Sequence, residues 1–145
     1  RELLELFALS DVKFDKVFIK EHPLFPVSSI IESSIKNFPP YEIFKDSVQE
    51  AFNHSDIVYT ANGSSVLLEA VVNNKQTISI ISLTSLPIPA VTNASNLHFV
   101  ENSVSLKNIL NKLSNDVKNN SQANKIENYI YIDKELKLWR RFLKL

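Results

Sequence analysis

Residues 56–74 (DIVYTANGSSVLLEAVVNN) constrain the fold of this chain more than any other stretch. Residues 56–60 are an apolar, β-branched run of strand length, and residues 61–65 are a small polar turn that contains the only glycine, Gly63. Residues 66–72 are an apolar run of helical character. This order predicts a strand, a tight turn and a helix. The backbone N–H groups and the positive dipole end of the helix would lie at the carboxyl edge of a sheet, where anions such as phosphate bind.

The polar residues of this unit follow one side of the expected helix. Glu69 is the only charged residue of the expected helix at 66–72. A spacing of three or four residues places the following side chains on one stripe of an otherwise apolar cylinder: Asn62, Ser65, Glu69, Asn73 and Gln76. The stripe begins at the expected phosphate-binding end, so we interpret it as a ligand-facing surface. The alternative is that it only faces solvent.

The rest of the chain alternates between strand-like and helix-like segments. We expect strands near residues 16–20, 41–44, 56–60, 76–82 and 97–100. We expect helices near residues 1–9, 28–36, 46–54 and 66–72, and one from Ser103 onward. Serine caps are expected for the helix at 28–36. For the helix at 46–54 we expect Asp46 or Ser47 as the cap, with Glu50 placed as in a capping box. The alternation predicts an α/β fold: a Rossmann-like, three-layer parallel sheet with helices on both faces and ligands at the carboxyl ends of its strands.

Two parts of unequal size are expected. Residues 1–120 would form the Rossmann-like domain, and residues 121–145 a linker and a C-terminal helical tail. Residues 115–125 are polar enough for a linker, whereas the chain from Ile126 onward is apolar and should pack on this domain or on an absent one. The chain contains no methionine and opens in a helical pattern, so we expect a fragment of a longer protein.

The composition narrows the class of protein. A chain of 145 residues that is 44% hydrophobic can bury the core of one domain. Sixteen basic residues balance sixteen acidic ones, which gives no electrostatic reason to expect nucleic acid as a partner. Cysteine is absent and the three histidines lie far apart, so no metal site is expected. No run approaches the roughly 20 apolar residues that span a bilayer. We therefore expect no transmembrane segment and a cytoplasmic location, with the inner face of the membrane as the alternative.

Three short motifs in a fixed order resemble those of a known enzyme class. Residues 20–23 (KEHP) give K-x-H-P at a strand end, residues 64–70 (SSVLLEA) give S-S-x-x-x-E-A after the strand at 56–60, and residues 77–80 (TISI) form the next strand. The chain from about Lys16 to its end resembles the carboxy-terminal, nucleotide-sugar-binding half of GT-B glycosyltransferases. It is most similar to bacterial surface-carbohydrate enzymes related to capsule Kdo transferases, polysialyltransferases and glycerophosphotransferases.

The end of the chain adds to this resemblance, and the turn departs from it. Residues 131–133 (YID) and 138–143 (LWRRFL) resemble the end of an uncharacterised surface carbohydrate biosynthesis family of that group. The turn has Gly63 alone, without the glycine-rich loops common in other GT-B enzymes.

The resemblance implies roles for individual residues. His22 would contact the donor phosphates, Ser64 and Ser65 would meet them at the helix start, and Glu69 would hold a donor hydroxyl, roles that suit the hydrogen-bonding groups of these side chains. Further side chains are expected to line the same edge: Lys20, Tyr59, Thr60, Asn62 and the loop at 84–89. The alternatives are that His22 is an ordinary loop residue, that the serines are a plain helix cap and that Glu69 is solvated. His54 and His98 are expected to be structural.

The expected function is donor binding within a glycosyltransferase of surface polysaccharide biosynthesis. The substrate would be a nucleotide-activated sugar, with no further cofactor, and a glycan or lipid-linked acceptor would bind through the missing half. That half usually brings the catalytic base, so no catalytic residue is assigned. A nucleotide-sugar epimerase of the same fold, which would need carboxylates for proton abstraction, is the first alternative. A non-catalytic interaction domain is the second, because fold does not fix function.

Overall fold

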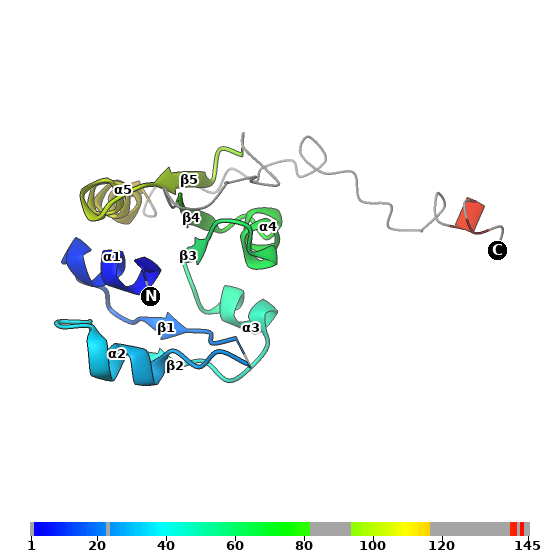
Figure 1. Ribbon diagram of the computed structural model, residues 1–145. Helices are drawn as coiled ribbons and strands as arrows, with labels where there is room; N and C mark the ends of the chain where they lie inside the picture. The colour runs from blue at the N-terminus through cyan, green and yellow to red at the C-terminus, as the bar shows by residue number, and fades with distance from the viewer. Residues whose placement is uncertain (1, 23, 82–93, 117–139, 142, 144–145) are drawn as a thin grey trace.

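The computed structural model describes residues 2–22, 24–81, 94–116, 140–141 and 143 of the chain (Figure 1). Its named elements are five helices and five strands, which makes the described part an α/β structure. In chain order they are α1 (Glu2–Ser10), β1 (Phe18–Ile19), α2 (Ser28–Ser34), β2 (Glu42–Ile43), α3 (Val48–Asn53), β3 (Ile57–Ala61), α4 (Ser65–Val72), β4 (Gln76–Ile80), β5 (Leu97–Val100) and α5 (Ser103–Asp116).

The strands are parallel, but they form two sheets. β1 pairs with β2 over two residues each, and β3, β4 and β5 form a second sheet in that order. The expectation of one sheet is therefore wrong for the described residues, although that of parallel pairing is confirmed. Pro39 and Pro40 stand close before β2 and have no backbone N–H, so the β1–β2 ladder cannot extend in that direction.

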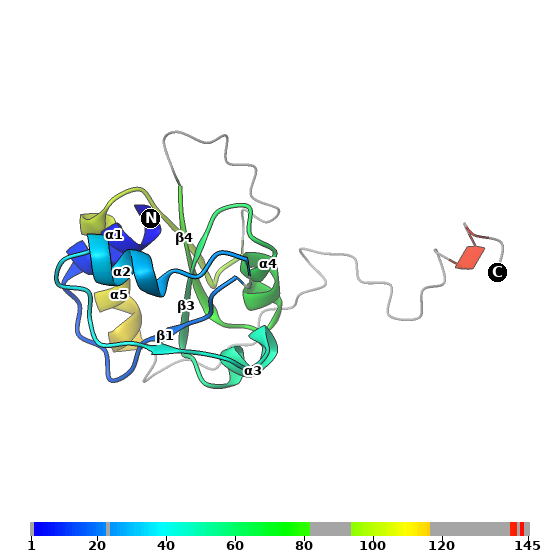
Figure 2. The ribbon, with the colours of Figure 1, turned by 60° about the horizontal axis from the view of Figure 1, so that its bottom comes forward.

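Helices cover both faces of the three-stranded sheet (Figures 1 and 2). Ile78 and Ile80 of β4 point to the face covered by α1 and α5, where they join a core cluster with Leu106 and Leu110. On the other face, a second cluster holds residues of α4 and β5: Leu67, Val71 and Leu97, with Ala94 just before that strand. The side chains of β4 alternate between the two faces, as in any strand, so Thr77 and Ser79 lie on the α4 side.

Aromatic rings connect the two sheets. The ring of Phe7 in α1 lies 5.4 Å from that of Phe14, 5.7 Å from that of Tyr59 in β3 and 5.6 Å from that of Phe38. The ring of Phe38 meets that of Tyr41, just before β2, edge to face at 5.5 Å. In Figure 1, α1 accordingly lies between α5 and the β1–β2 pair. Among the described residues, side-chain packing and not strand pairing therefore connects the two sheets.

The cap of α2 differs from expectation. Its N-cap residue is Val27, which offers no side-chain hydrogen bond. Instead Oε1 of Glu21 accepts from the backbone N–H groups of Val27 (2.6 Å) and Ser28 (2.9 Å) and from the Ser28 hydroxyl (3.2 Å). The predicted serine cap is thus wrong here, because a carboxylate from the preceding loop reaches the helix start and outcompetes a hydroxyl as an acceptor.

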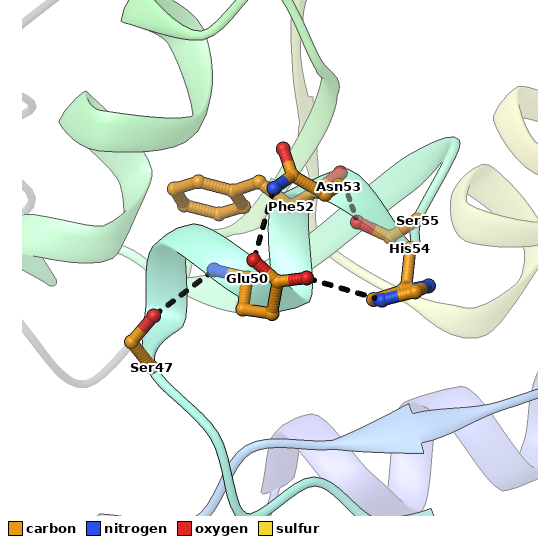
Figure 3. A network of polar contacts seen from close by, with 6 residues as sticks. All are labelled: Ser47, Glu50, Phe52, Asn53, His54 and Ser55. Atoms are coloured by element: carbon orange, nitrogen blue, oxygen red, sulfur yellow. Dashed lines mark hydrogen bonds and ion pairs between the residues drawn. The ribbon is translucent and has the colours of Figure 1, made fainter.

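The cap of α3 follows the prediction in part (Figure 3). Ser47 is the N-cap, and its hydroxyl accepts from the backbone N–H of Glu50 at 3.1 Å. The Glu50 carboxylate does not close the capping box. It accepts from Nδ2 of Asn53 at 3.1 Å and lies 3.3 Å from Nε2 of His54.

Two expectations lie largely outside the described residues, namely the loop at 84–89 and the tail at 121–145. Within the described ranges, no helix has both the length and the apolar character needed to cross a bilayer.

Candidate functional site

The turn between β3 and α4 has the conformation that the sequence predicts. Gly63 has a φ of +81°, a left-handed conformation that favours glycine, and a Cβ built there would meet no atom within 4 Å. Ser64 is the N-cap of α4, and its hydroxyl accepts from the backbone N–H of Val66 at 3.3 Å. The turn thus leads straight from the carboxyl end of β3 into the start of α4, and it is open on the side of Gly63.

The stripe along α4 divides into a free half and a bonded half. Ser65 and Glu69 are exposed, and in the described structure neither the hydroxyl nor the carboxylate has a hydrogen-bond or ion-pair partner. Asn73, by contrast, donates from Nδ2 to the backbone oxygen of Glu69 (2.8 Å), and its Oδ1 accepts from Gln49 (2.8 Å). Gln76 contacts Nε2 of His98 at 3.2 Å. Along the described part of α4, the hydroxyl and carboxylate without partners are therefore those nearest the turn.

Among the described residues, three buried side-chain polar atoms have no hydrogen-bond partner, and two of them lie near this end of the sheet. These two are Oδ1 of Asn62, in the turn, and Oγ of Ser79, on the α4 side of β4. Ser79 is fully buried and lies opposite Thr60 in the ladder, one residue before the end of β4. An unpaired buried polar atom costs about 1–3 kcal/mol, and most such atoms in folded proteins are paired. Two unsatisfied polar groups therefore lie at the edge where α/β folds bind ligands, and the third, Oδ1 of Asn96, lies just before β5, at the opposite edge.

His22 lies at the end of β1 and is exposed, with its ring held in place by backbone contacts. Its Nδ1 accepts from the backbone N–H of Leu24 at 3.2 Å, and its carbonyl oxygen accepts from the N–H of Phe25 at 2.9 Å. Because Nδ1 is an acceptor, the neutral ring carries its proton on Nε2. The ring therefore presents an N–H donor at the surface.

The residue before it, Glu21, fixes this loop through its bonds to α2. The N–H donors of Ser28 and Val27 lower the pKa of its carboxyl below the ordinary value of 4.5, so it stays ionised at neutral pH. Sequence reasoning missed this role. A signal was present, since a lone carboxylate stands shortly before a helix start that has no Asp or Asn.

The remaining predicted residues fall into separate places. Thr60 is half-buried at the end of β3, beside the turn. Nζ of Lys20 donates to the backbone oxygen of Lys45 at 3.4 Å, which ties β1 to the segment after β2. Tyr59 points to the opposite face, where its hydroxyl donates to the backbone oxygen of Leu3, so it does not line the turn.

The predicted residues thus form two groups. One is the turn group, which the β3–α4 unit holds together: Thr60, Asn62, Ser64, Ser65 and Glu69. The other is the pair of Lys20 and His22 on the loop after β1. Among the described residues, no hydrogen bond joins the two groups.

The two other histidines make local contacts. His54 lies against the Glu50 carboxylate and 5.9 Å from the ring of Phe44. His98 is half-buried, and its burial, aided by the charge of Lys112, lowers its pKa. Within the described ranges, no three His, Asp or Glu side chains gather closely enough to hold a metal ion.

Comparison with protein families, with curated proteins and with solved structures finds no match to this chain.

Proposed function

We propose that this chain is the donor-binding half of a glycosyltransferase of surface polysaccharide biosynthesis, and that it binds a nucleotide-activated sugar at the β3–α4 turn. The parallel strands and the helices on both faces of the larger sheet are compatible with the Rossmann-like, three-layer fold that this function requires. In such folds the ligand lies at the carboxyl ends of the strands, which is where the turn group is found.

The observation that carries the proposal is the chemistry around the start of α4. Ser65 offers a free hydroxyl at the positive end of the helix, and the turn beside it is open. Two buried polar atoms without partners, on Asn62 and Ser79, lie close to the same edge. A pyrophosphate suits this place, because helix-start N–H groups and serine hydroxyls donate hydrogen bonds to phosphate oxygens.

We assign roles to the other residues of the site. Glu69 lies one turn beyond Ser65, about 6 Å along the helix axis, a distance that suits a sugar or ribose hydroxyl when phosphate sits at the helix start. Its free carboxylate accepts hydrogen bonds from such hydroxyls. His22 contributes its Nε2–H, Thr60 and Asn62 line the turn, and Lys20 supplies a positive charge near the end of β1. The catalytic base comes from the acceptor-binding half.

The test is a calorimetric titration of the chain with CMP-, CDP- and UDP-linked sugars, the free nucleotides and inorganic pyrophosphate. The proposal predicts weak binding of one nucleotide family and no turnover by the chain alone, because binding and reacting groups are divided between two halves. If neither pyrophosphate nor any nucleotide binds, the proposed function is wrong. Turnover by the isolated chain would contradict the division of roles.

A further inference from the structure

Two of the most exposed large apolar side chains are consecutive in the sequence. Leu24 is 76% exposed and Phe25 is 69% exposed, and both lie in the loop at the carboxyl end of β1, next to His22. Single exposed apolar residues are common and need no explanation. Here, however, an exposed aromatic ring stands beside a fixed hydrogen-bond donor at an edge of a parallel pair of strands, where α/β proteins bind ligands.

Hydrogen bonds fix the backbone before and after Phe25 in the sequence. Its N–H donates to the carbonyl oxygen of His22 at 2.9 Å, and the two residues form an isolated antiparallel bridge. The N–H of Leu24 donates to Nδ1 of His22, and the Glu21 carboxylate holds the N–H groups of Val27 and Ser28. A surface whose geometry is set before binding loses less conformational entropy when a ligand arrives.

Two flat rings result from this arrangement. The centroids of the His22 and Phe25 rings are 5.3 Å apart, and the ring planes are inclined at 38°. The exposed ring of Phe25 offers an apolar aromatic surface, and the neighbouring ring of His22 offers its Nε2–H as a donor. The complementary ligand has a flat ring and, close to that ring, an oxygen that accepts a hydrogen bond.

We propose that Phe25 is a stacking surface for the nucleobase of the donor, and that the Nε2–H of His22 donates to a ribose or phosphate oxygen of the same nucleotide. The inference rests on the proposed function and adds to it a residue outside the K-x-H-P motif. A nucleobase fits better than a protein partner, because a stable protein interface buries about 800 Å² per partner. Leu24 and Phe25 alone do not offer that area, whereas one ring suffices to stack one base.

The experiment compares the chain with Phe25→Leu and Phe25→Trp, using whichever free nucleotide binds best and inorganic pyrophosphate as the two probes. Phe25→Leu keeps an apolar side chain and removes the ring. Because stacking on an aromatic side chain contributes about 1–3 kcal/mol per base, the affinity for the nucleotide should fall about 5- to 150-fold. The affinity for pyrophosphate should not change. Phe25→Trp should retain nucleotide affinity, and its new indole should be quenched by the nucleotide and not by pyrophosphate.

The matched control is Val104→Ala on α5, since Val104 is 67% exposed and belongs to a different surface. It should leave both affinities unchanged. Unchanged nucleotide affinity in Phe25→Leu, or an equal loss for nucleotide and pyrophosphate, would overturn the stacking role while the proposed function stands. Loss of a dimer in Phe25→Leu, seen by sedimentation with nucleotide affinity unchanged, would assign the surface to a second copy of the chain. If the unaltered chain binds neither probe, both proposals fall together.

Discussion

The phenol hydroxyl of Tyr59 in β3 donates a hydrogen bond to the backbone oxygen of Leu3 in α1, at 3.1 Å, across 56 positions of sequence. This bond joins the first helix to the first strand of the larger sheet. The same ring stacks on Phe7, so Tyr59 takes part in both the polar and the aromatic contacts of α1.

Tyr59→Phe removes this hydrogen bond and keeps the ring. We expect a loss of about 0.5–1.5 kcal/mol in the free energy of unfolding, the usual net value of one such bond, measured by urea denaturation. Tyr41→Phe is the matched control, because the Tyr41 hydroxyl has no hydrogen-bond partner among the described residues. Equal effects of the two substitutions would show that the bond to Leu3 contributes nothing specific.

The same tyrosine should make stability depend on pH in alkaline solution. Burial, with a smaller effect from the charge of Glu2, raises the pKa of Tyr59 above its ordinary value of 10.0. The unfolded chain therefore loses this proton first as the pH rises past about 10, which lowers the free energy of unfolding. Thermal melts between pH 8 and 11 should show a steeper decline for the unaltered chain than for Tyr59→Phe. Parallel declines would contradict this assignment.

Glu21 should make the stability of the chain depend on pH in acid solution, where stability is lost as the pH falls. Its folded-state pKa lies below the ordinary value of 4.5, so its stabilising effect is complete well above that pH and is lost as the pH falls through the folded-state pKa. Glu21→Gln should lower the melting temperature at pH 7 and reduce its dependence on pH below 5. Glu32→Gln, at an exposed position of α2, should change neither. A melting temperature that is insensitive to Glu21→Gln at pH 7 would show that the carboxylate does not cap α2.

The N-cap of α3 allows a test with a simple magnitude. Ser47→Ala leaves the backbone N–H of Glu50 without its acceptor, and loss of such a cap costs about 0.5–2 kcal/mol. Ser29→Ala in α2 is the control, because the Ser29 hydroxyl forms no hydrogen bond among the described residues. Denaturation curves should separate the two variants by about 1 kcal/mol, and coincident curves would exclude a capping role for Ser47.

Glycine should be required at position 63 because of the backbone conformation there, and not because a side chain would lack space. A Cβ there meets nothing within 4 Å, but a φ of +81° is costly for a residue with a side chain. Gly63→Ala should therefore lower stability by about 1 kcal/mol, and Gly63→Asn by less, because asparagine tolerates this conformation. If Gly63→Ala is as stable as the unaltered chain, the turn adopts a different conformation in solution.

Local patterns in the sequence predicted the elements well. The strand at 97–100 matches β5, and the cap at Ser47 and the turn at Gly63 are found as expected, because each depends on residues a few positions apart. The direction of Tyr59 and the division into two sheets could not be predicted in this way. The contacts of Tyr59, with Leu3 and Phe7, are to residues far away in the sequence, and so are the pairings that define the two sheets.

For the candidate site, the sequence placed the turn group together, since its five residues belong to one strand, turn and helix. It did not indicate that the far end of the stripe is hydrogen-bonded, because the partners of Asn73 and Gln76 come from α3 and β5. The capping role of Glu21 was missed for a similar reason, since its acceptor function depends on how the loop folds back on α2.

The affinity of the chain for its nucleotide donor after Glu69→Gln tests the central claim most directly. The substitution preserves the shape of an exposed side chain and removes its charge, so the melting temperature should stay nearly unchanged. If Glu69 accepts a hydrogen bond from a donor hydroxyl, calorimetry should show nucleotide-sugar binding weakened about tenfold to a hundredfold. Glu32→Gln, at another exposed glutamate in a different helix, should leave binding unchanged. Unchanged donor affinity in Glu69→Gln would remove Glu69 from the site and contradict the account of α4 as its donor-binding helix.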